Sequence, residues 1–590
     1  MIRKIVAGVS LILLTFSFAA AASRPNLVLI TLDSTRADRM GFLGAKGALT
    51  PDLDRLAGES IVFEHAYSQA PSSVVSHATI LSGAYPQSTG MSEIGGTLPA
   101  SLPYLPELLR TQGYSPAAFV GSIDLDPVNG LAQGFDRGFQ TYDAGFRPVI
   151  PGDARPPETE RCGNQVVARA LAWLDHNAHA QEQAQFFLWV HISDVHIEDA
   201  RAPSTSYKSA VTAADAAVGK LIRALQQRKI YENTAVVVVA DHGESLGAHG
   251  EETHGIFLYD ETIHVPLLIK LPEGQTAAKP ATTGVAVRVA AKVRLVDIAP
   301  TLLEIAAIPV PSQMQGQSLL RIAKSTPSGG GNGSDQPVYS RSDLPQRGFG
   351  WSPLESWRAG KYLYIRAPKP ELYDLTADPA AAHNLAQTSK ATLDTMAAQL
   401  DNFDRHFSGE AGKSSVELSS SEMQKLASLG YVGLQKSSAS AAAVGGIDPK
   451  DKIATANKVI EAALARYQSK PGFAIAQART IAALEPIISA DPNLYLAQYT
   501  LGVALARKAQ YPEAVTHLHK AIELQPDSAW AHYEIGASLL KAGDFKTAIV
   551  HLEIAAGRLP RFSPAHAALA EAYEHAGRTE DAKKERGKVK

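Results

Sequence analysis

The sequence predicts an α/β catalytic region followed by an all-α repeat region, and three observations lead to this fold class. Apolar runs alternate with helix-period segments over about residues 24–320, as in a parallel sheet with helices on both faces. Two of these runs, Asn26–Asp33 and Ala235–Asp241, end in carboxylates, as strands do at the ligand-binding edge of such a sheet. Near the C-terminus, three prolines recur at a spacing of 34 residues, a period typical of helical repeats.

Composition sets the outer bounds of the prediction. The chain has 590 residues, which is too long for one hydrophobic core, so two or more domains are expected. Its hydrophobic content of 45% and charged content of 19% are those of a globular protein. The net charge of -3 gives no basic surface for nucleic acid. Because Cys162 is the single cysteine, no intrachain disulfide forms.

The N-terminus has the three parts of a secretory signal. Arg3 and Lys4 precede the apolar stretch Ile5–Phe18, and Ala20–Ala22 forms a small-residue cleavage site. We therefore expect residues 1–22 to be a signal peptide and the protein to be periplasmic or secreted. The alternative is an uncleaved anchor. The stretch is shorter than the roughly 20 residues that a spanning helix needs, so cleavage is favoured, with no membrane span left after it.

The α/β region, about 24–320, provides the strands and helices of the first domain. A polar, Gly-rich loop at 325–334 follows it. The predicted strands are Asn26–Asp33, Ser115–Val120, Phe186–Ile192, Ala235–Ala240 and Val265–Leu271, and the predicted helices include Thr50–Glu59 and Ser209–Gln227.

A smaller α+β unit is expected over residues 335–433. Trp357–Ile365 and Glu371–Leu375 have the apolar patterns of its strands. Ser, Ala and Gly then dominate residues 434–450, which predicts a flexible linker.

The last region, 451–590, is predicted to be a helical solenoid. Behind each of the three prolines a similar pattern recurs, as in Tyr499–Gly502 followed by Ala514 and Tyr533–Gly536 followed by Ala548. Small residues at fixed offsets let two helices approach closely, and this pattern resembles tetratricopeptide repeats. Such repeats present a concave surface to a protein or peptide partner. The alternative is that they only pack against the catalytic region or a second subunit. The clear units are 492–525, 526–559 and 560–590.

The strand ends carry the chemistry. Asp33 and the pair Asp241 and His242 follow buried strands, so they are expected to meet at one edge of the sheet. The hydroxyl-bearing segment Ser72–Ser76 lies between them in the sequence. Oxygen and imidazole ligands beside a serine indicate a metal-activated nucleophile.

Several motifs together resemble the sulfatase-like branch of the alkaline phosphatase superfamily. They occur in that family's order over about residues 24–433, and Leu429–Gly433 with the repeats resembles a subgroup with tetratricopeptide tails. The motifs are Asn26–Gly41, Thr50–Leu56, Ser76–Pro86, Asp241–Gly250 and Glu371–Pro379 with Asn384 and Leu385.

The resemblance implies a role for each matching residue. One divalent metal ion is expected, because the usual Asp-x-x-x-His spacing of a second site is missing, and imidazole favours Zn or Mn over Ca or Mg. The implied metal ligands are Asp33, Asp241, His242 and Ser73, with Ser73 also the nucleophile; His77, His196 and His254 are the implied catalytic or substrate-contacting residues.

The departures from the sulfatase pattern matter as well. The segment Ser73–His77 lacks the proline and arginine of the Cys/Ser-x-Pro-x-Arg motif, and His77 stands in place of the arginine. Ser34 replaces the second aspartate of sulfatases, and Val120–Ile123 lacks their lysine and histidine. No formylglycine is therefore expected, and the ligand set resembles that of the phosphoryl-transferring members.

The predicted function is a metal-dependent hydrolase of phosphate or sulfate esters, with phosphoesters favoured. Attack by a plain serine on phosphorus leaves a phosphoserine that water can hydrolyse, whereas a serine sulfate lacks the elimination route of formylglycine. Two alternatives stay open: a transferase that passes a phosphoryl-linked group to a cell-envelope sugar or lipid, and a weakly catalytic scaffold whose repeats bind proteins.

Overall fold

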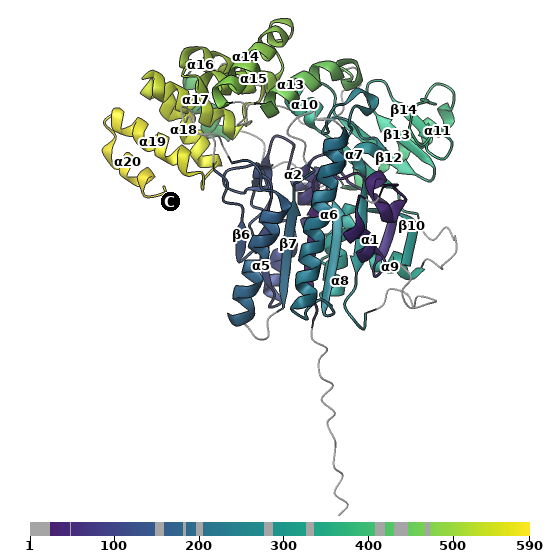
Figure 1. Ribbon diagram of the computed structural model, residues 1–590. Helices are drawn as coiled ribbons and strands as arrows, with labels where there is room; N and C mark the ends of the chain where they lie inside the picture. Colours follow the sequence, from purple (N-terminus) through teal and green to yellow (C-terminus); the bar gives the residue numbers. More distant parts are fainter. Residues whose placement is uncertain are drawn as a thin grey trace, which may run out of the picture.

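The computed structural model describes residues 24–47, 49–147, 158–180, 185–195, 204–275, 287–325, 335–407, 419–429, 446–465 and 472–589. The predicted signal peptide, His196, the Gly-rich loop and most of the predicted linker lie outside these residues. The described part forms an α/β layer, a small second sheet and an array of helices at one end of the main sheet (Figure 1).

The main sheet has eight strands in the order β10-β2-β9-β8-β1-β7-β4-β6. The five strands expected from the sequence are among them. Their bounds are β1 Asn26–Leu32, β2 Ile61–Tyr67, β4 Ser115–Phe119, β6 Thr141–Asp143, β7 Phe186–Ile192, β8 Thr234–Ala240, β9 His264–Lys270 and β10 Val287–Arg294.

The expectation of a fully parallel sheet is wrong at one strand. β9 pairs antiparallel with both β8 and β2, while the other pairings of this sheet are parallel. A parallel neighbour needs a crossover, usually through a long helix. The segment between β8 and β9 contains only two short helical turns among its described elements, a 3-10 turn at Ala248–Gly250 and α7 at Asp260–Ile263, so the chain returns in the opposite direction.

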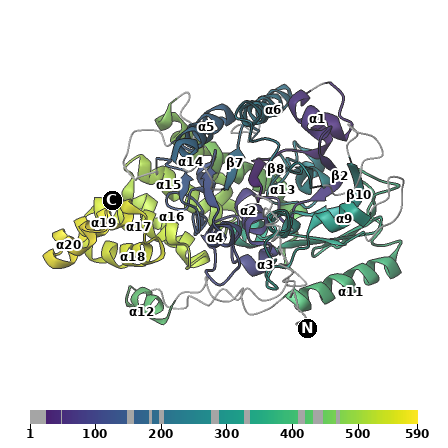
Figure 2. The same ribbon diagram turned by 90° about the horizontal axis from the view of Figure 1, so that it is seen from below.

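Helices cover both faces of the main sheet, as expected (Figure 2). On one face α1 (Pro51–Ala57), α5 (Gly163–Ala180) and α6 (Ser204–Gln227) pack together, and α6 begins earlier than the predicted Ser209. The other face carries α2, α4 and α8, which contact one another. The remaining bounds on this side are α2 Ser73–Ser82, α3 Pro86–Thr89, α4 Leu105–Thr111, α8 Ile298–Ile305 and α9 Leu319–Ser325.

The second sheet is four-stranded and antiparallel. Trp357–Ile365 is a hairpin rather than one strand, because Gly360 turns the chain with φ +54°. Helix α11 (Lys390–Phe407) packs on strands of this sheet, and its residues Met396, Leu400 and Phe403 are buried. The elements are β11 Val338–Ser342, α10 Leu344–Phe349, β12 Leu354–Ala359, β13 Tyr362–Arg366, β14 Glu371–Asp374, α11 Lys390–Phe407 and α12 Ser420–Ser428, and a separate short pair is formed by β3 Gly96–Thr97 and β5 Ala132–Gln133.

The C-terminal region is all-α, as the repeat pattern predicted. Consecutive helices pack as pairs, and the small residues lie where the helices meet. A Cβ atom at Gly502 would lie 2.6 Å from Leu518 Cγ, and one at Gly536 would lie 2.7 Å from Leu552 Cγ. The helices are α13 Ile453–Ala465, α14 Phe473–Ala490, α15 Tyr495–Arg507, α16 Tyr511–Leu524, α17 Ala529–Ala542, α18 Phe545–Arg558, α19 Ser563–His575 and α20 Thr579–Arg586.

This close approach gives a stability prediction. Gly536→Val is expected to lower the free energy of unfolding of the repeat region by about 1–3 kcal/mol, because the added carbons overpack the α17–α18 contact. Gly557→Ala is the matched control: no atom lies within 4 Å of its added Cβ, so it is expected to stabilise α18 by about 0.5–1 kcal/mol. Urea unfolding followed by circular dichroism measures both, and equal effects would contradict the packing account.

The last residues of the predicted linker are ordered. The Ser352 amide donates to the Ile447 carbonyl at 3.0 Å, and the Lys369 amide donates to Asp448 Oδ2 at 2.9 Å. Residues 446–450 therefore dock on the small α+β unit instead of forming flexible linker, because these contacts satisfy two of its backbone amides. Among the described helices, none has the length and apolar character needed to cross a membrane.

Candidate active site and metal centre

The strand-end residues lie next to one another at the carboxyl edge of the main sheet. β1 and β8 are paired so that Leu32 faces Ala240, which places Asp33 and Asp241 side by side. Both are buried. The Ser34 amide donates to Asp241 Oδ1 at 3.2 Å, and the Ser34 hydroxyl donates to Asp33 Oδ1 at 3.0 Å.

Ser34 holds this turn in an unusual backbone conformation. Its φ of +50° lies in the left-handed region, which non-glycine residues seldom adopt and which marks functional turns. In this position its amide and hydroxyl bind both carboxylates. Ser34 therefore orients the two acids and adds no further negative charge to the site.

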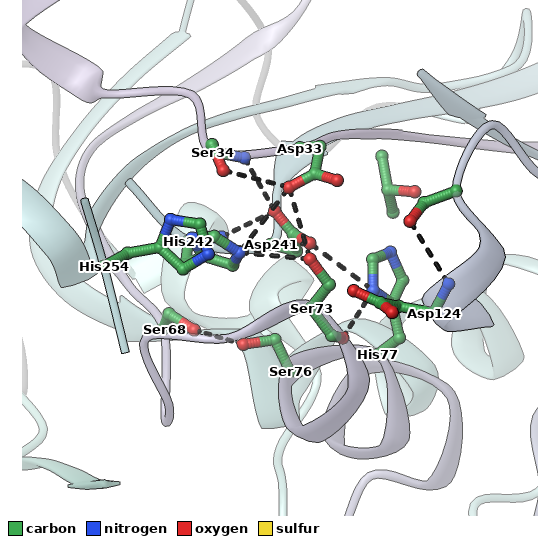
Figure 3. Close-up of polar contacts among 12 residues, drawn as sticks. Asp33, Ser34, Ser68, Ser73, Ser76, His77, Asp124, Asp241, His242 and His254 are labelled. Carbon is green, nitrogen blue, oxygen red and sulfur yellow. Dashed lines mark hydrogen bonds and ion pairs between the residues drawn. The ribbon is translucent and has the colours of Figure 1, made fainter. Parts of the chain in front are cut away.

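Ser73 is the first residue of α2 and faces the two acids (Figure 3). Its Oγ donates to Asp33 Oδ1 at 3.2 Å and lies 3.1 Å from His242 Nε2. The helix begins after Ser72 and ends at Gly83, which has φ +64°. A helix N-terminus carries a partial positive charge that favours an anion. The hydroxyl thus lies where the acids, the imidazole and the helix end meet.

Asp33, Asp241 and His242 form a donor set that fits a divalent metal ion. Their ligand atoms lie within 4.8 Å of one another. Burial, reinforced by the charge of Asp33, holds the pKa of Asp241 well above its usual range. Asp241 Oδ2 is buried without a hydrogen-bond partner. Two buried carboxylates side by side are costly unless a cation neutralises them.

His77 lies beneath the nucleophile and is fully buried. Its Nδ1 lies 2.7 Å from the Ser73 carbonyl oxygen and 3.6 Å from Asp241 Oδ2. Burial, with the nearby His191, holds the pKa of His77 well below its usual range, so the imidazole is neutral. A neutral, solvent-inaccessible ring differs from the arginine it replaces in sulfatases, and this geometry orients the start of α2.

His191 is a site residue that the sequence interpretation missed. It lies on β7 opposite Thr31 of β1, and its Nε2 is 3.4 Å from Asp33 Oδ2. With His77 and Asp241 it forms a second group whose ligand atoms lie within 4.8 Å of one another. The available signal was a single histidine near the end of an otherwise apolar strand, next to the strand that ends in Asp33.

His254 lies at the solvent side of the site. Its Nδ1 is 3.1 Å from Glu244 Oε2, and its ring centroid is 4.4 Å from that of His242. The side chain is 20% exposed, whereas those of His77 and His242 are fully buried. His249 instead stacks on Tyr259, at a centroid distance of 3.6 Å. His196, the remaining predicted site residue, lies outside the described residues.

Comparisons with known families agree with this architecture. Residues 25–308 match the sulfatase family, and residues 252–405 match the C-terminal part of N-sulphoglucosamine sulphohydrolase. Residues 502–543 match a TPR repeat, and residues 539–585 match a tetratricopeptide repeat.

Individual relatives cover the catalytic part of the chain. The ulvan-active sulfatase of Formosa agariphila is 28% identical over 64% of this chain and 80% of its own length. The Δ4,5-hexuronate-2-O-sulfatase of Bacteroides thetaiotaomicron is 24% identical over 63% of this chain and 86% of its own length. The phosphonate monoester hydrolase structure of Agrobacterium radiobacter shares the fold, with a TM-score of 0.51 and 18% identity over 65% of this chain and 96% of that one.

Residues 25–308 of the chain thus form a sulfatase domain. With its C-terminal tetratricopeptide repeats, the protein is a sulfatase-like ester hydrolase with a repeat tail. The sulfatase family is metal-dependent, and the buried donor set described above is suited to a metal ion.

Proposed function

We propose that the protein hydrolyses phosphate or sulfate esters, with phosphoesters preferred, through an unmodified Ser73. The observation that carries this proposal is the position of Ser73 Oγ, within hydrogen-bond distance of both Asp33 and His242 at the start of α2. A hydroxyl between metal ligands and a helix N-terminus is placed to attack a tetrahedral anionic centre. The sequence around it lacks the proline and arginine of the formylglycine motif.

The preference for phosphoesters follows from the fate of the covalent intermediate. Ser73 Oγ bonds to phosphorus as the ester oxygen leaves, and water then attacks the phosphoserine at phosphorus to release phosphate and free serine. With a sulfate ester the same attack leaves a serine sulfate. Formylglycine releases sulfate by eliminating it from its hydrate, a route that a serine side chain lacks. The sulfate esters named for the relatives are therefore the second substrate class here.

Asp33, Asp241 and His242 would hold one divalent ion, with Zn or Mn preferred because of the imidazole ligand. Such an ion lowers the pKa of a bound hydroxyl and neutralises charge on the ester oxygens. The Ser73 hydroxyl already donates toward Asp33 Oδ1. His254 is partly exposed and held by Glu244, so it is placed to give a proton to the leaving oxygen.

Export to the periplasm or outside the cell also belongs to the proposal. It rests on the charged, apolar and small-residue segments of residues 1–22.

A paired assay tests the proposed function. Metal-free protein is reloaded with Zn, Mn, Mg or Ca and assayed with phenyl phosphate, diphenyl phosphate and phenyl sulfate. Turnover of the phosphoesters above that of the sulfate supports the proposal. Sulfate turnover without phosphoester turnover would overturn it.

The role of His254 depends on the leaving group. His254→Ala is expected to slow hydrolysis of an alkyl phosphate by about 10²–10⁴-fold, because an alkoxide needs a proton to leave. Hydrolysis of 4-nitrophenyl phosphate should change much less, since that phenolate leaves without one. His249→Ala, in the same loop but stacked on Tyr259, is the matched control. Equal losses on both esters would contradict an acid role.

A further inference from the structure

The repeat region helps to form a cleft beside the active site. The first helices of two consecutive repeats, α15 and α17, face loops of the catalytic region across a space of about 240 Å³. The aromatic side chains of this cleft all come from the repeats. The lining includes Ile123, Asp124, Leu131, Tyr495, Tyr499 and Trp530.

The catalytic wall of the cleft adjoins the nucleophile helix. The 3-10 turn Ile123–Leu125 follows β4 at the carboxyl edge of the sheet and contacts α2. Figure 3 draws Asp124 at the end of α2 that carries Ser73 and His77. One side of this turn therefore borders the site of reaction, and residues of the same turn line the cleft.

The repeats are also fixed to the other side of the site. Asn457 of α13 donates through Nδ2 to the Gly250 carbonyl at 2.7 Å and accepts from the Glu252 amide at 3.2 Å. These backbone groups belong to the loop that leads from His242 to His254. An ion pair of 2.9 Å between Arg347 and Asp527 joins α10 to the start of α17. These contacts hold the repeat helices in place beside the site.

The chemistry of the lining fits a ring. Tyr495 and Tyr499 lie parallel, with centroids 5.8 Å apart and an interplanar angle of 8°, and Trp530 adds a third aromatic side chain. Apolar and aromatic walls with a few polar groups are typical of small-molecule sites. The volume is below the roughly 300 Å³ of the smaller drug-sized pockets, so the cleft suits a group of one or two rings and excludes a helix.

We propose that this cleft is the leaving-group subsite, and that Tyr499 and Trp530 stack on a sugar or aromatic ring of the ester's alcohol portion. The inference rests on the proposed ester hydrolysis at Ser73. It makes the repeats part of the substrate-binding site. An aryl ring presents its flat face to an aromatic side chain, and a sugar ring presents an apolar face of C–H groups, so the test uses both.

The test compares ring-bearing and ring-free esters in the full-length, metal-loaded protein. Tyr499→Ala and Trp530→Ala are expected to lower kcat/KM for phenyl phosphate or a hexose monophosphate by about 5–100-fold, as the loss of a stacking contact does, mostly through KM. For ethyl phosphate the change should stay within about twofold, since a ring-free group makes no stacking contact. Tyr511→Ala, at the start of α16 and outside the cleft lining, is the matched control.

Trp530→Phe keeps a ring and tests for misfolding, because Trp530 also packs on Phe562 at a centroid distance of 4.9 Å. It is expected to retain most of the ring preference. A loss on the hexose ester alone identifies a sugar, and a loss on both identifies a site that accepts either kind of ring. Equal losses on ring-bearing and ring-free esters, or no loss on either, would overturn the subsite.

The same comparison remains decisive if the proposed phosphoester preference fails. Phenyl sulfate and ethyl sulfate then replace the phosphates, and the ring dependence of kcat/KM is read in the same variants. A ring preference that persists with sulfates supports the cleft while the phosphoester preference is rejected. A peptide partner in place of a ring would leave all of these ratios unchanged, which would also overturn the subsite.

Discussion

Ser73→Ala is expected to reduce kcat by about 10⁴–10⁶-fold, the range seen when a nucleophile is removed from a hydrolase. Its hydroxyl lies between Asp33 and His242 at the start of α2, and the neighbouring helix residues are buried. Alanine keeps the helix and removes the attacking oxygen. Initial rates with phenyl phosphate under saturating metal give the value.

Ser76→Ala is the matched control for this change. Ser76 lies on the same helix, but its hydroxyl is 2.8 Å from Ser68 Oγ and donates to the Ala70 carbonyl at 2.9 Å. Its loss is expected to cost stability and to leave kcat within a few-fold. If Ser73→Ala retained more than a tenth of the activity, another group would have to be the nucleophile.

Removal of the divalent ion is expected to have an effect of similar size. A chelator should lower kcat by at least about 10³-fold, since the hydroxyl then keeps its ordinary pKa and the ester oxygens keep their charge. Asp241→Asn should remove the rise in melting temperature that Zn or Mn gives to the wild-type protein, because a main ligand loses its charge. Activity that survives both treatments would contradict a metal centre.

The metal-free protein should also show a characteristic dependence on pH. Its folded state holds the pKa of Asp241 well above that of the unfolded chain, through burial and the charge of Asp33. The protonated acid is therefore favoured in the fold. Stability is full below the unfolded pKa and falls as the pH rises toward the raised one. Asp241→Asn should flatten this fall, and metal affinity should rise with pH over the same window. Thermal melts of the metal-free protein at a series of pH values measure this dependence of stability on pH.

The parts of the fold that could be predicted from the sequence are those that short-range sequence patterns determine. Apolar runs that end in Asp33 and Asp241 define buried strands and their ligand edge, and the repeat of small residues at Gly502 and Gly536 requires closely packed helices. The direction of β9 depends on the connection before it, which no short-range pattern specifies. The hairpin at Gly360 was hidden within one apolar run for the same reason.

The site was predicted where motifs are contiguous and missed where they are not. Asp33, Ser73, Asp241 and His242 each follow a strand end or begin a helix, and the structure brings them together. His191 joins them only through strand pairing. From the sequence alone, its strand is therefore interpreted as an ordinary core strand without a site residue. The placement of the repeats over the active site arises from contacts such as Asn457 with the loop at Gly250, which link residues that are distant in the sequence.

The most direct test of an unmodified serine nucleophile is the mass of the peptide that contains residue 73, taken from protein purified from its own source. We expect an intact serine in the active protein, and a phosphorylated form of that peptide after acid quenching during phosphoester turnover. A peptide lighter by two hydrogens, trapped by a hydrazine reagent, would identify formylglycine. That result would contradict the serine mechanism and make sulfate esters the preferred substrates.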